Sequence, residues 1–258
     1  MIKAGPAGLG PTKEAIERLE EFSKEGISAC EIAFTYGIYI KEKKQAEEIR
    51  EEARKKGIRL SIHAPYWINL NSKEKKKTEE SKERILKCCE IGHYLGAYRI
   101  VFHPGYYGIM DHEETYQNIK KAILEMQKEI KKNEWKTELA PETTGKVNVF
   151  GSTDETLRLV KETGCAFCID FAHILAREKK VDYAKILEKF KSFKQLHIHF
   201  SGIEYGEKGE RRHVKTRDKE IKELLENLKK HAKDKEIVII NESPYNIKDS
   251  IRTLELLH

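Results

Sequence analysis

The chain has no apolar run as long as a membrane-spanning helix requires, which is about 18 residues. Charged residues make up 36% of its 258 positions. The segment after Met1 also lacks the apolar stretch of a secretory signal peptide. From these absences we expect a cytoplasmic protein without a membrane partner.

Cysteine is scarce, and linkers rich in proline or glycine are missing. The five cysteines are an odd number in a chain long enough to form a core without cross-links, so we expect no disulfide framework. Cys165 and Cys168 form a C-x-x-C pattern, but residues three apart in a strand face opposite sides, so we expect no shared metal or redox site there. The missing linkers predict one domain over residues 1–258. The net charge of +6 permits a polyanionic partner without requiring one.

Short apolar segments of strand-forming residues alternate with charged segments of helical spacing. The candidate strands cover residues 2–4, 27–34, 58–62, 98–102, 137–140, 165–169, 195–200 and 237–240. Asn71 with Glu74, and Ser152 with Glu155, predict capping boxes, and Gly164 predicts a helix end. Eight strand–helix units in about 250 residues are typical of a single (β/α)8 TIM barrel in the α/β class. A doubly wound open sheet is the alternative, because alternation alone does not show closure.

Histidine, aspartate or glutamate follows six of the predicted strands. In a parallel barrel these positions share the C-terminal face, where catalysis takes place. Buried acids and imidazoles gathered there without a cation would be costly, since the carboxylates would repel one another. Mixed nitrogen and oxygen donors suit zinc, with manganese or iron as alternatives. The candidate metal ligands are His63, His103, Glu142, Asp170, His173, His197 and Glu242, with His213 as an eighth.

The number of candidate ligands predicts more than one ion. A single catalytic zinc takes about three protein ligands and a water. The set found here is large enough for two or three Zn²⁺ ions, or for Mn²⁺ or Fe²⁺ in their place. Ions held about 3.5–4 Å apart are typical of enzymes that displace phosphoryl groups, because both the attacking and the leaving oxygen need stabilisation.

The same segments, in the same order, resemble those of the endonuclease IV family, which are metal-dependent AP endonucleases (AP endonuclease family 2) of the xylose-isomerase-like TIM barrel superfamily. The matching segments are HAPYWINL at 63–70, HPG at 103–105, PETTGK at 141–146, DFAH at 170–173, the histidine at 197 and ESP at 242–244. The resemblance covers nearly the whole chain and implies the same barrel fold.

The resemblance also implies a role for each ligand. A first ion would be held by His63, His103 and Glu142. Glu142 would bridge to a second ion, which Asp170, His197 and Glu242 also hold. His173 and His213 would help to hold a third ion.

One position departs from the family pattern. The family has an Asp-x-His segment for its third ion, whereas this chain has Arg211 and Arg212 before His213. Glu210 lies one residue away and could replace the missing acid after a loop shift, and the two arginines could instead contact phosphate. His199 lies two residues from His197 on one strand face and could contribute as well, although we expect His197 to be the ligand.

The activity implied by the resemblance is hydrolysis of the phosphodiester 5′ to an abasic site in double-stranded DNA, as in base excision repair. Glu142 would orient the attacking hydroxide. Tyr66 and Trp67 follow the first ligand, and we expect them to contact DNA. Tyr36 and Tyr39 would either contact DNA or simply cover the mouth of the barrel. We expect a monomer.

A sugar isomerase or epimerase of the same barrel superfamily is the alternative hypothesis. Such an enzyme uses one divalent metal, and four of the ligands would be enough for it. A metal-binding or DNA-binding module without catalysis is a third hypothesis. The number of ions per chain distinguishes the nuclease from the isomerase or epimerase. Cleavage of an abasic oligonucleotide distinguishes the nuclease from the module without catalysis.

Overall fold

Parallel strands form the centre of the molecule in the computed structural model, which describes residues 1–257. Each of the expected strands is present, although the sixth has only two residues. The strands of the barrel are β1 (Ile2–Pro6), β2 (Ala29–Ala33), β3 (Arg59–His63), β4 (Arg99–Phe102), β5 (Glu138–Pro141), β6 (Ile169–Asp170), β7 (Gln195–Phe200) and β10 (Glu236–Asn241).

The strands close into a barrel. Hydrogen bonds join them in the orders β1-β10-β7-β6 and β2-β3-β4-β5. Single parallel bridges link the two groups, one between Ala7 and Glu31 and the other between Glu142 and Cys168. The chain therefore has the (β/α)8 fold, and the alternative of an open doubly wound sheet is wrong.

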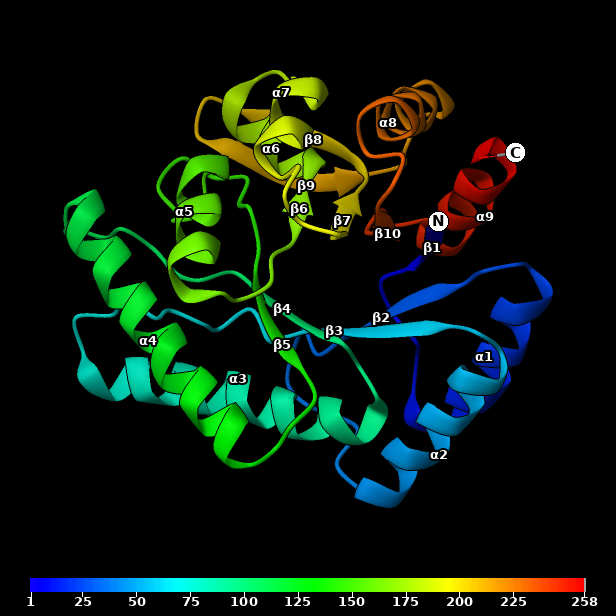
Figure 1. Cartoon of the computed structure of the whole chain (residues 1–258), viewed down its shortest axis with the longest axis horizontal. Coiled ribbons are helices and arrows are strands. Elements are labelled where there is room, and N and C mark those ends of the chain that lie inside the picture. Colours follow the sequence, from blue (N-terminus) through cyan, green and yellow to red (C-terminus); the bar gives the residue numbers. More distant parts are fainter. Residues whose placement is uncertain (258) are drawn as a thin grey trace.

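Helices surround the strands, and the colours of Figure 1 run once around the ring until β1 lies beside β10. The helical segments are a 3-10 turn (Thr12–Glu14), α1 (Ala15–Lys24), α2 (Lys43–Lys55), α3 (Lys75–Leu95), α4 (His112–Lys132), α5 (Thr153–Thr163), α6 (Phe171–Glu178), α7 (Tyr183–Lys189), α8 (Asp218–His231) and α9 (Asn246–Leu257). None of the helices within residues 1–257 has the length and apolar character needed to cross a membrane.

The predicted helix boundaries are partly correct. Ser152 and Glu155 form the expected capping box at the start of α5, and Gly164 ends that helix with a φ of 68°. The capping box predicted at Asn71 and Glu74 is wrong. The Asn71 amide donates instead to the carbonyl oxygen of Tyr106, because Asn71 ties together two loops rather than a helix end.

Apolar side chains pack on both sides of the barrel wall. Along β4, Ile100 and Phe102 belong to the large cluster between strands and helices, whereas Val101 belongs to a small separate cluster. This alternation follows from the opposite orientation of successive strand residues. Nearer the carboxyl ends of the strands, buried polar groups such as Glu142, His199 and Asp170 replace the apolar ones.

An antiparallel hairpin that the sequence did not predict follows β7. It consists of β8 (Gly202–Gly206) and β9 (Gly209–Val214), and its register shifts between Glu204 and Tyr205. The hairpin folds back against α6, so residues far along the loop return to the barrel mouth. Its position brings Glu210 and His213 beside the ends of the strands.

Candidate metal centre

The first donor set consists of His63, His103 and Glu142, as the sequence predicted. They lie at the end of β3, just after β4 and just after β5. The Nε2 atoms of His63 and His103 are 3.2 Å and 2.9 Å from Glu142 Oε2. These three side chains offer donor atoms within 4.8 Å of one another. They can therefore approach one cation together.

The second donor set consists of Glu142, Asp170, His199 and Glu242, whose donor atoms also lie within 4.8 Å of one another. His199 Nδ1 is 3.0 Å from Glu142 Oε1 and 3.3 Å from Glu242 Oε1. Glu142 thus directs one carboxylate oxygen to each donor set. The structure places His199 in the position that the sequence predicted for His197.

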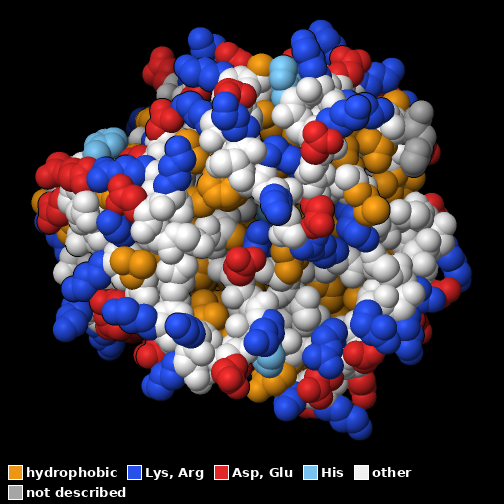
Figure 2. Space-filling model, in the orientation of Figure 1, with side chains coloured by type: hydrophobic (Ala, Val, Ile, Leu, Met, Phe, Trp, Pro, Cys, Tyr) orange, Lys and Arg blue, Asp and Glu red, His pale blue; other side chains and the backbone are white. Residues whose placement is uncertain are grey.

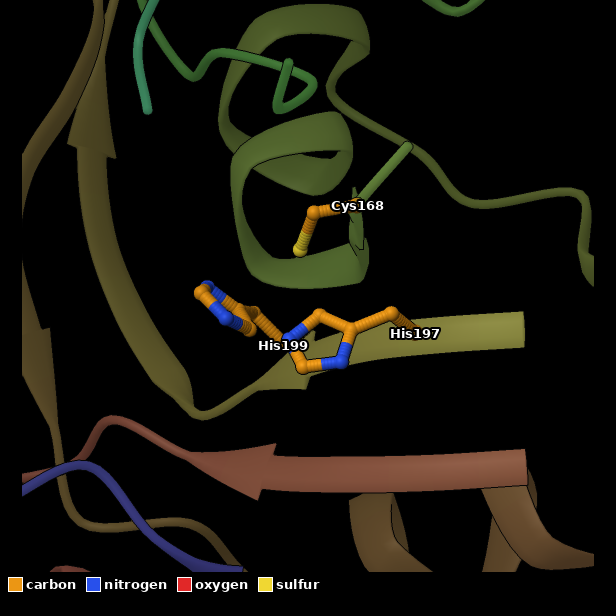
Figure 3. Close-up of side chains that lie close together, drawn as sticks. All are labelled: Cys168, His197 and His199. Carbon is orange, nitrogen blue, oxygen red and sulfur yellow. The ribbon is translucent and has the colours of Figure 1, made fainter. Parts of the chain in front are cut away.

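His197 lies one layer deeper in the barrel, so the prediction that it joins this set does not fit the structure. Two residues along a strand span about 6.6 Å, which separates the two imidazoles although they share a face. Figure 3 shows both rings projecting from β7 beside the Cys168 thiol. The Nδ1 atom of His197 lies 2.6 Å from the Tyr98 hydroxyl, and its Nε2 atom lies 3.1 Å from Glu31 Oε2. Both nitrogens of His197 thus have partners below the second donor set, although His197 also lies with Cys168 and His199 in a group whose donor atoms are within 4.8 Å of one another.

A third donor set consists of Asp170, His173 and His213. Glu210 joins it from the hairpin, with Oε2 3.4 Å from His173 Nε2 and Oε1 3.8 Å from His213 Nε2. Glu210 thus occupies the place of the missing acid, as the sequence allowed.

Arg211 and Arg212 do not join the third donor set. The Arg212 guanidinium binds Glu204 on the exposed hairpin, with Nε 2.9 Å from Oε2. The Arg211 guanidinium packs over Gly206. Both side chains are exposed, and their contact with phosphate stays a prediction.

Sequence reasoning missed Glu31, a fully buried acid on β2. Its Oε2 atom accepts a hydrogen bond from Ser61 Oγ at 2.8 Å, and its Oε1 atom lies 2.9 Å from His199 Nε2. The signal was an acid in the apolar segment Ala-Cys-Glu-Ile-Ala at 29–33. Because Glu31 stands inside its strand, it does not belong to the pattern of acids and histidines that follow the strands.

Buried carboxylates and histidines lie close together at the site and shift one another's pKa values. Burial and the neighbouring charges of Glu142 and Glu242 raise the pKa of Asp170 well above its ordinary value. Burial also acts to raise the pKa of Glu142, but His199 and His103 outweigh it and hold that pKa well below the ordinary value. Burial acts to lower the pKa of His63, yet its hydrogen bond to Glu142 and the nearby acids raise it to about 9. Positive charge is therefore favoured at this site.

Two buried atoms facing the donor sets have no hydrogen-bond partner within residues 1–257. They are Asp170 Oδ2 and His103 Nε2, the latter 2.9 Å from Glu142 Oε2 but without the geometry of a hydrogen bond. Buried polar atoms without hydrogen bonds are costly, and cations at the donor sets of Asp170 and His103 would satisfy them. Carboxylate and imidazole donors together suit zinc, manganese or iron. The side chains present therefore fit a divalent transition metal.

A cavity of about 370 Å³ opens above the donor sets. Its lining includes His63, His103, His173, His213 and Glu242. Tyr66 stands at its edge, 57% exposed, with its ring centroid 6.4 Å from that of His103. The cavity therefore gives a substrate direct access to the metal-binding groups.

A second hollow of about 800 Å³ lies beside the mouth, and we call it the aromatic groove. It is lined by Tyr36, Gly37, Ile38, Ile40, Lys41, Lys43, Pro65, Trp67, Arg84, Lys87, Glu90, Ile91 and Tyr94. The rings of Tyr36 and Trp67 are 6.3 Å apart and largely exposed. Tyr39 is absent from this lining and packs edge-on against Phe34, which fits a covering role. Figure 2 shows lysine and arginine interspersed with acidic side chains over the visible face, without one large basic area.

The chain belongs to the xylose isomerase-like TIM barrel family, whose sequence profile matches residues 19–255. It is 38% identical to an uncharacterized protein of Methanocaldococcus jannaschii, over 95% of this chain and 92% of that protein. It is 25% identical to a probable endonuclease 4 of Aquifex aeolicus, over 59% of this chain and 58% of that protein. The chain thus spans little more than half the length of that relative.

Solved structures that include an endonuclease and an epimerase-like protein share the fold. SacUVDE superimposes with a TM-score of 0.78 at 16% identity, covering 100% of this chain and 98% of that one. Endonuclease IV from Thermus thermophilus gives 0.73 at 19% identity, covering 99% and 98%. A D-tagatose 3-epimerase-like protein gives 0.74 at 20% identity, covering 99% and 95%. Since endonuclease and epimerase structures are about equally similar, the site rather than the fold must separate these activities.

Proposed function

We propose that the protein is a metal-dependent AP endonuclease, similar to endonuclease IV, which hydrolyses the phosphodiester 5′ to an abasic site in DNA. The observation that carries the proposal is the first donor set, His63 and His103 against Glu142 Oε2, next to a second set that uses Glu142 Oε1. A shared carboxylate between two donor sets suits a cluster of ions. An enzyme that binds one ion at the second donor set would not need His63 and His103 as metal ligands.

Divalent cations at these sets would supply the positive charge that activates water and stabilises a leaving oxygen. Zinc is the proposed metal, with manganese or iron as alternatives. Glu142 would orient the attacking group, because its two oxygens face different donor sets across the floor of the cavity. Asp170, His199 and Glu242 would hold the second position, and His173, His213 and Glu210 would serve a third.

The proposed substrate is double-stranded DNA. Tyr66 and Trp67 lie three and four residues after His63 and are exposed at the mouth, where aromatic rings can stack on bases or fill the space of a missing one. Trp67 and Tyr36 continue into the aromatic groove, where Lys41 and Lys87 could neutralise phosphate charge. The protein is proposed to act as a monomer.

A sugar epimerase is the second candidate, and the second donor set favours it. Glu142, Asp170, His199 and Glu242 could hold one ion by themselves. The cavity of about 370 Å³ is also large enough for a small sugar. This hypothesis predicts one ion per chain and no cleavage of DNA.

The deciding experiment measures metal content and cleavage on the same preparation. Zinc-loaded protein should carry at least two ions and should nick a duplex with one abasic analogue, while an undamaged duplex stays intact. His103→Ala should lose one ion and the cleavage activity, because it removes a donor of the first set only. His112→Ala is the matched control, since His112 lies exposed on α4 and its side chain is 73% accessible. One ion per chain and an intact abasic duplex would refute the nuclease.

A further inference from the structure

A buried carboxylate links the two imidazoles of β7. Glu31 is fully buried, and it pairs in register with Ser61 of β3. Its Oε2 atom lies 2.8 Å from Ser61 Oγ and 3.1 Å from His197 Nε2. Its Oε1 atom lies 2.9 Å from His199 Nε2. One acid therefore contacts both histidines from below the second donor set.

The contacts of His197 assign its protons. Tyr98 lies 2.6 Å from Nδ1, and because an ionised Glu31 at Nε2 can only accept, Nδ1 of the neutral imidazole accepts the Tyr98 hydroxyl proton. A neutral imidazole that accepts at Nδ1 carries its proton on Nε2. The Nε2–H group then donates to Glu31, which also accepts the Ser61 hydroxyl proton. The Oε2 side of Glu31 is therefore occupied by two donors.

His199 is constrained from both sides. Its Nδ1 atom faces Glu142 and Glu242, which belong to the second donor set, and its Nε2 atom faces Glu31. The contact with Glu31 is close but is not aligned as a hydrogen bond. Even so, an unprotonated Nε2 would set its lone pair against those of the carboxylate. Glu31 therefore favours a proton on Nε2. Nδ1 hydrogen-bonds with Glu142 Oε1 at 3.0 Å in the metal-free chain, and it is the nitrogen that a cation at the second donor set would take.

We propose that Glu31 is a positioning residue of the metal centre, which fixes the tautomer and orientation of His199 so that Nδ1 points at the second donor set. The inference rests on the proposed metal centre and adds a residue to it that stands on a strand without any ligand. Carboxylate partners of metal-binding histidines typically change metal affinity by about 10–100-fold. Figure 3 shows the two rings at different positions along β7, and of the two only His199 also faces Glu142 and Glu242.

Glu31→Gln is the informative substitution, because it keeps the shape and changes one oxygen into an N–H donor. The carbonyl oxygen of the new side chain should stay with Ser61 and His197, which both donate. Its amide N–H would then face His199 Nε2 and favour a proton on Nδ1. We expect zinc affinity at the second donor set to fall by about 10–100-fold.

Two measurements test the proposal. Titration of the full chain with Zn²⁺ against a chromophoric chelator gives the affinity and the number of ions. Nitrogen-15 NMR of the imidazoles in metal-free protein reports which nitrogen of His199 carries the proton, and a purely structural role of Glu31 would not change it. Tyr98→Phe is the matched control: it removes a buried polar group from the same chain of contacts but leaves Glu31 beside His199. Its zinc affinity should remain that of the wild type.

Wild-type zinc affinity in Glu31→Gln, with His199 still protonated on Nε2, would overturn the inference. If that variant fails to fold, Glu31→Asp decides, because it keeps the charge but withdraws it by one methylene. It should also bind zinc more weakly, and wild-type affinity would again count against Glu31. A wild-type chain that binds zinc but leaves DNA intact would refute the nuclease and not this inference. A wild-type chain that binds no metal would refute the centre, and the tautomer measurement would still test Glu31.

Discussion

Asp170→Asn should make the metal-free protein more stable, although it removes a central acid. Asp170 ends β6 and begins α6, where its Oδ1 atom accepts a hydrogen bond from the backbone of His173 at 2.6 Å. Asparagine caps helices about as well as aspartate, so this contact would remain. Asp170 Oδ2 has no hydrogen-bond partner and faces other acids. An amide N–H₂ in its place could donate to Glu142 or Glu242.

The expected gain follows from that orphaned oxygen. An unsatisfied buried polar group costs about 1–3 kcal/mol, so the free energy of unfolding should rise by about that amount. In a chain of this size about 1 kcal/mol changes the Tm by about 2–4 °C. Calorimetry or circular dichroism of chelator-treated protein at pH 7 would measure the change.

The gain should depend on pH in a defined direction. Burial and the charges of Glu142 and Glu242 raise the folded-state pKa of Asp170 above its unfolded value of 3.8. The stability that Asp170 contributes is then fully present below that unfolded pKa and is lost as pH rises through the folded pKa. The difference between variant and wild type should therefore be small at pH 4 and larger at pH 7.

Metal should reverse the order of stability. A ligand present at 100 times its Kd stabilises a folded protein by about 2.7 kcal/mol, and Asp170→Asn should lose much of this gain because it lacks one donor. Asp249→Asn is a matched control, since Asp249 is buried but accepts hydrogen bonds from Thr216 N and Ser243 Oγ. It should destabilise the chain with or without metal. A metal-free Asp170→Asn protein less stable than the wild type at pH 7 would refute the claim that Asp170, beside Glu142 and Glu242, destabilises the metal-free chain.

Two further predictions concern regions outside the donor sets. Trp67→Ala and Lys87→Glu should each weaken binding of an abasic duplex, measured by fluorescence anisotropy, and the lysine variant should lose more at low salt because its contact is electrostatic; unchanged affinity in both would remove the aromatic groove from DNA binding. Glu155→Gln should cost about 1–2 kcal/mol at pH 7, where the carboxylate accepts hydrogen bonds from Ser152 and Tyr107. Burial acts to raise the Glu155 pKa, but these hydrogen bonds outweigh it and lower the pKa, so this stability is present above the unfolded pKa and is lost as pH falls through the folded pKa. Thermal unfolding at pH 7 and pH 3 should show a smaller deficit at the lower pH, and an equal deficit at both would contradict the prediction.

The barrel could be predicted because its wall repeats one pattern. Each strand carries alternating apolar residues, and parallel strands place their last residues at one end. That geometry alone brings His63, His103 and Glu142 together. It does not decide between two histidines on the same strand face, because the depth of each depends on the stagger of neighbouring strands. His199 lies level with Glu142, whereas His197 lies level with Glu31, and no periodicity in the sequence shows this.

The hairpin is a second limit of prediction. The segment after β7 has charged residues and three glycines that favour a loop. Its two strands contact α6, which precedes β7 in the sequence. The position of Glu210 beside His173 follows from the register shift in that hairpin. The alternatives of Glu210 and Arg211 for the third donor set could therefore be stated from the sequence but not decided.

The number of buried acids bears on the number of ions. Burial and the neighbouring acids raise the pKa of Asp170, but a bound cation would ionise it, and Glu31, Glu142, Asp170 and Glu242 then bring four negative charges to one end of the barrel. One divalent cation would leave two of these charges to be balanced by protonated His63 and His199, and a protonated imidazole has no lone pair for a metal. Two divalent cations would balance all four and leave every imidazole neutral. Since a neutral His63 is useful only beside a cation at the first donor set, the charge balance favours the cluster that a phosphodiesterase needs over the single ion that suffices for an epimerase.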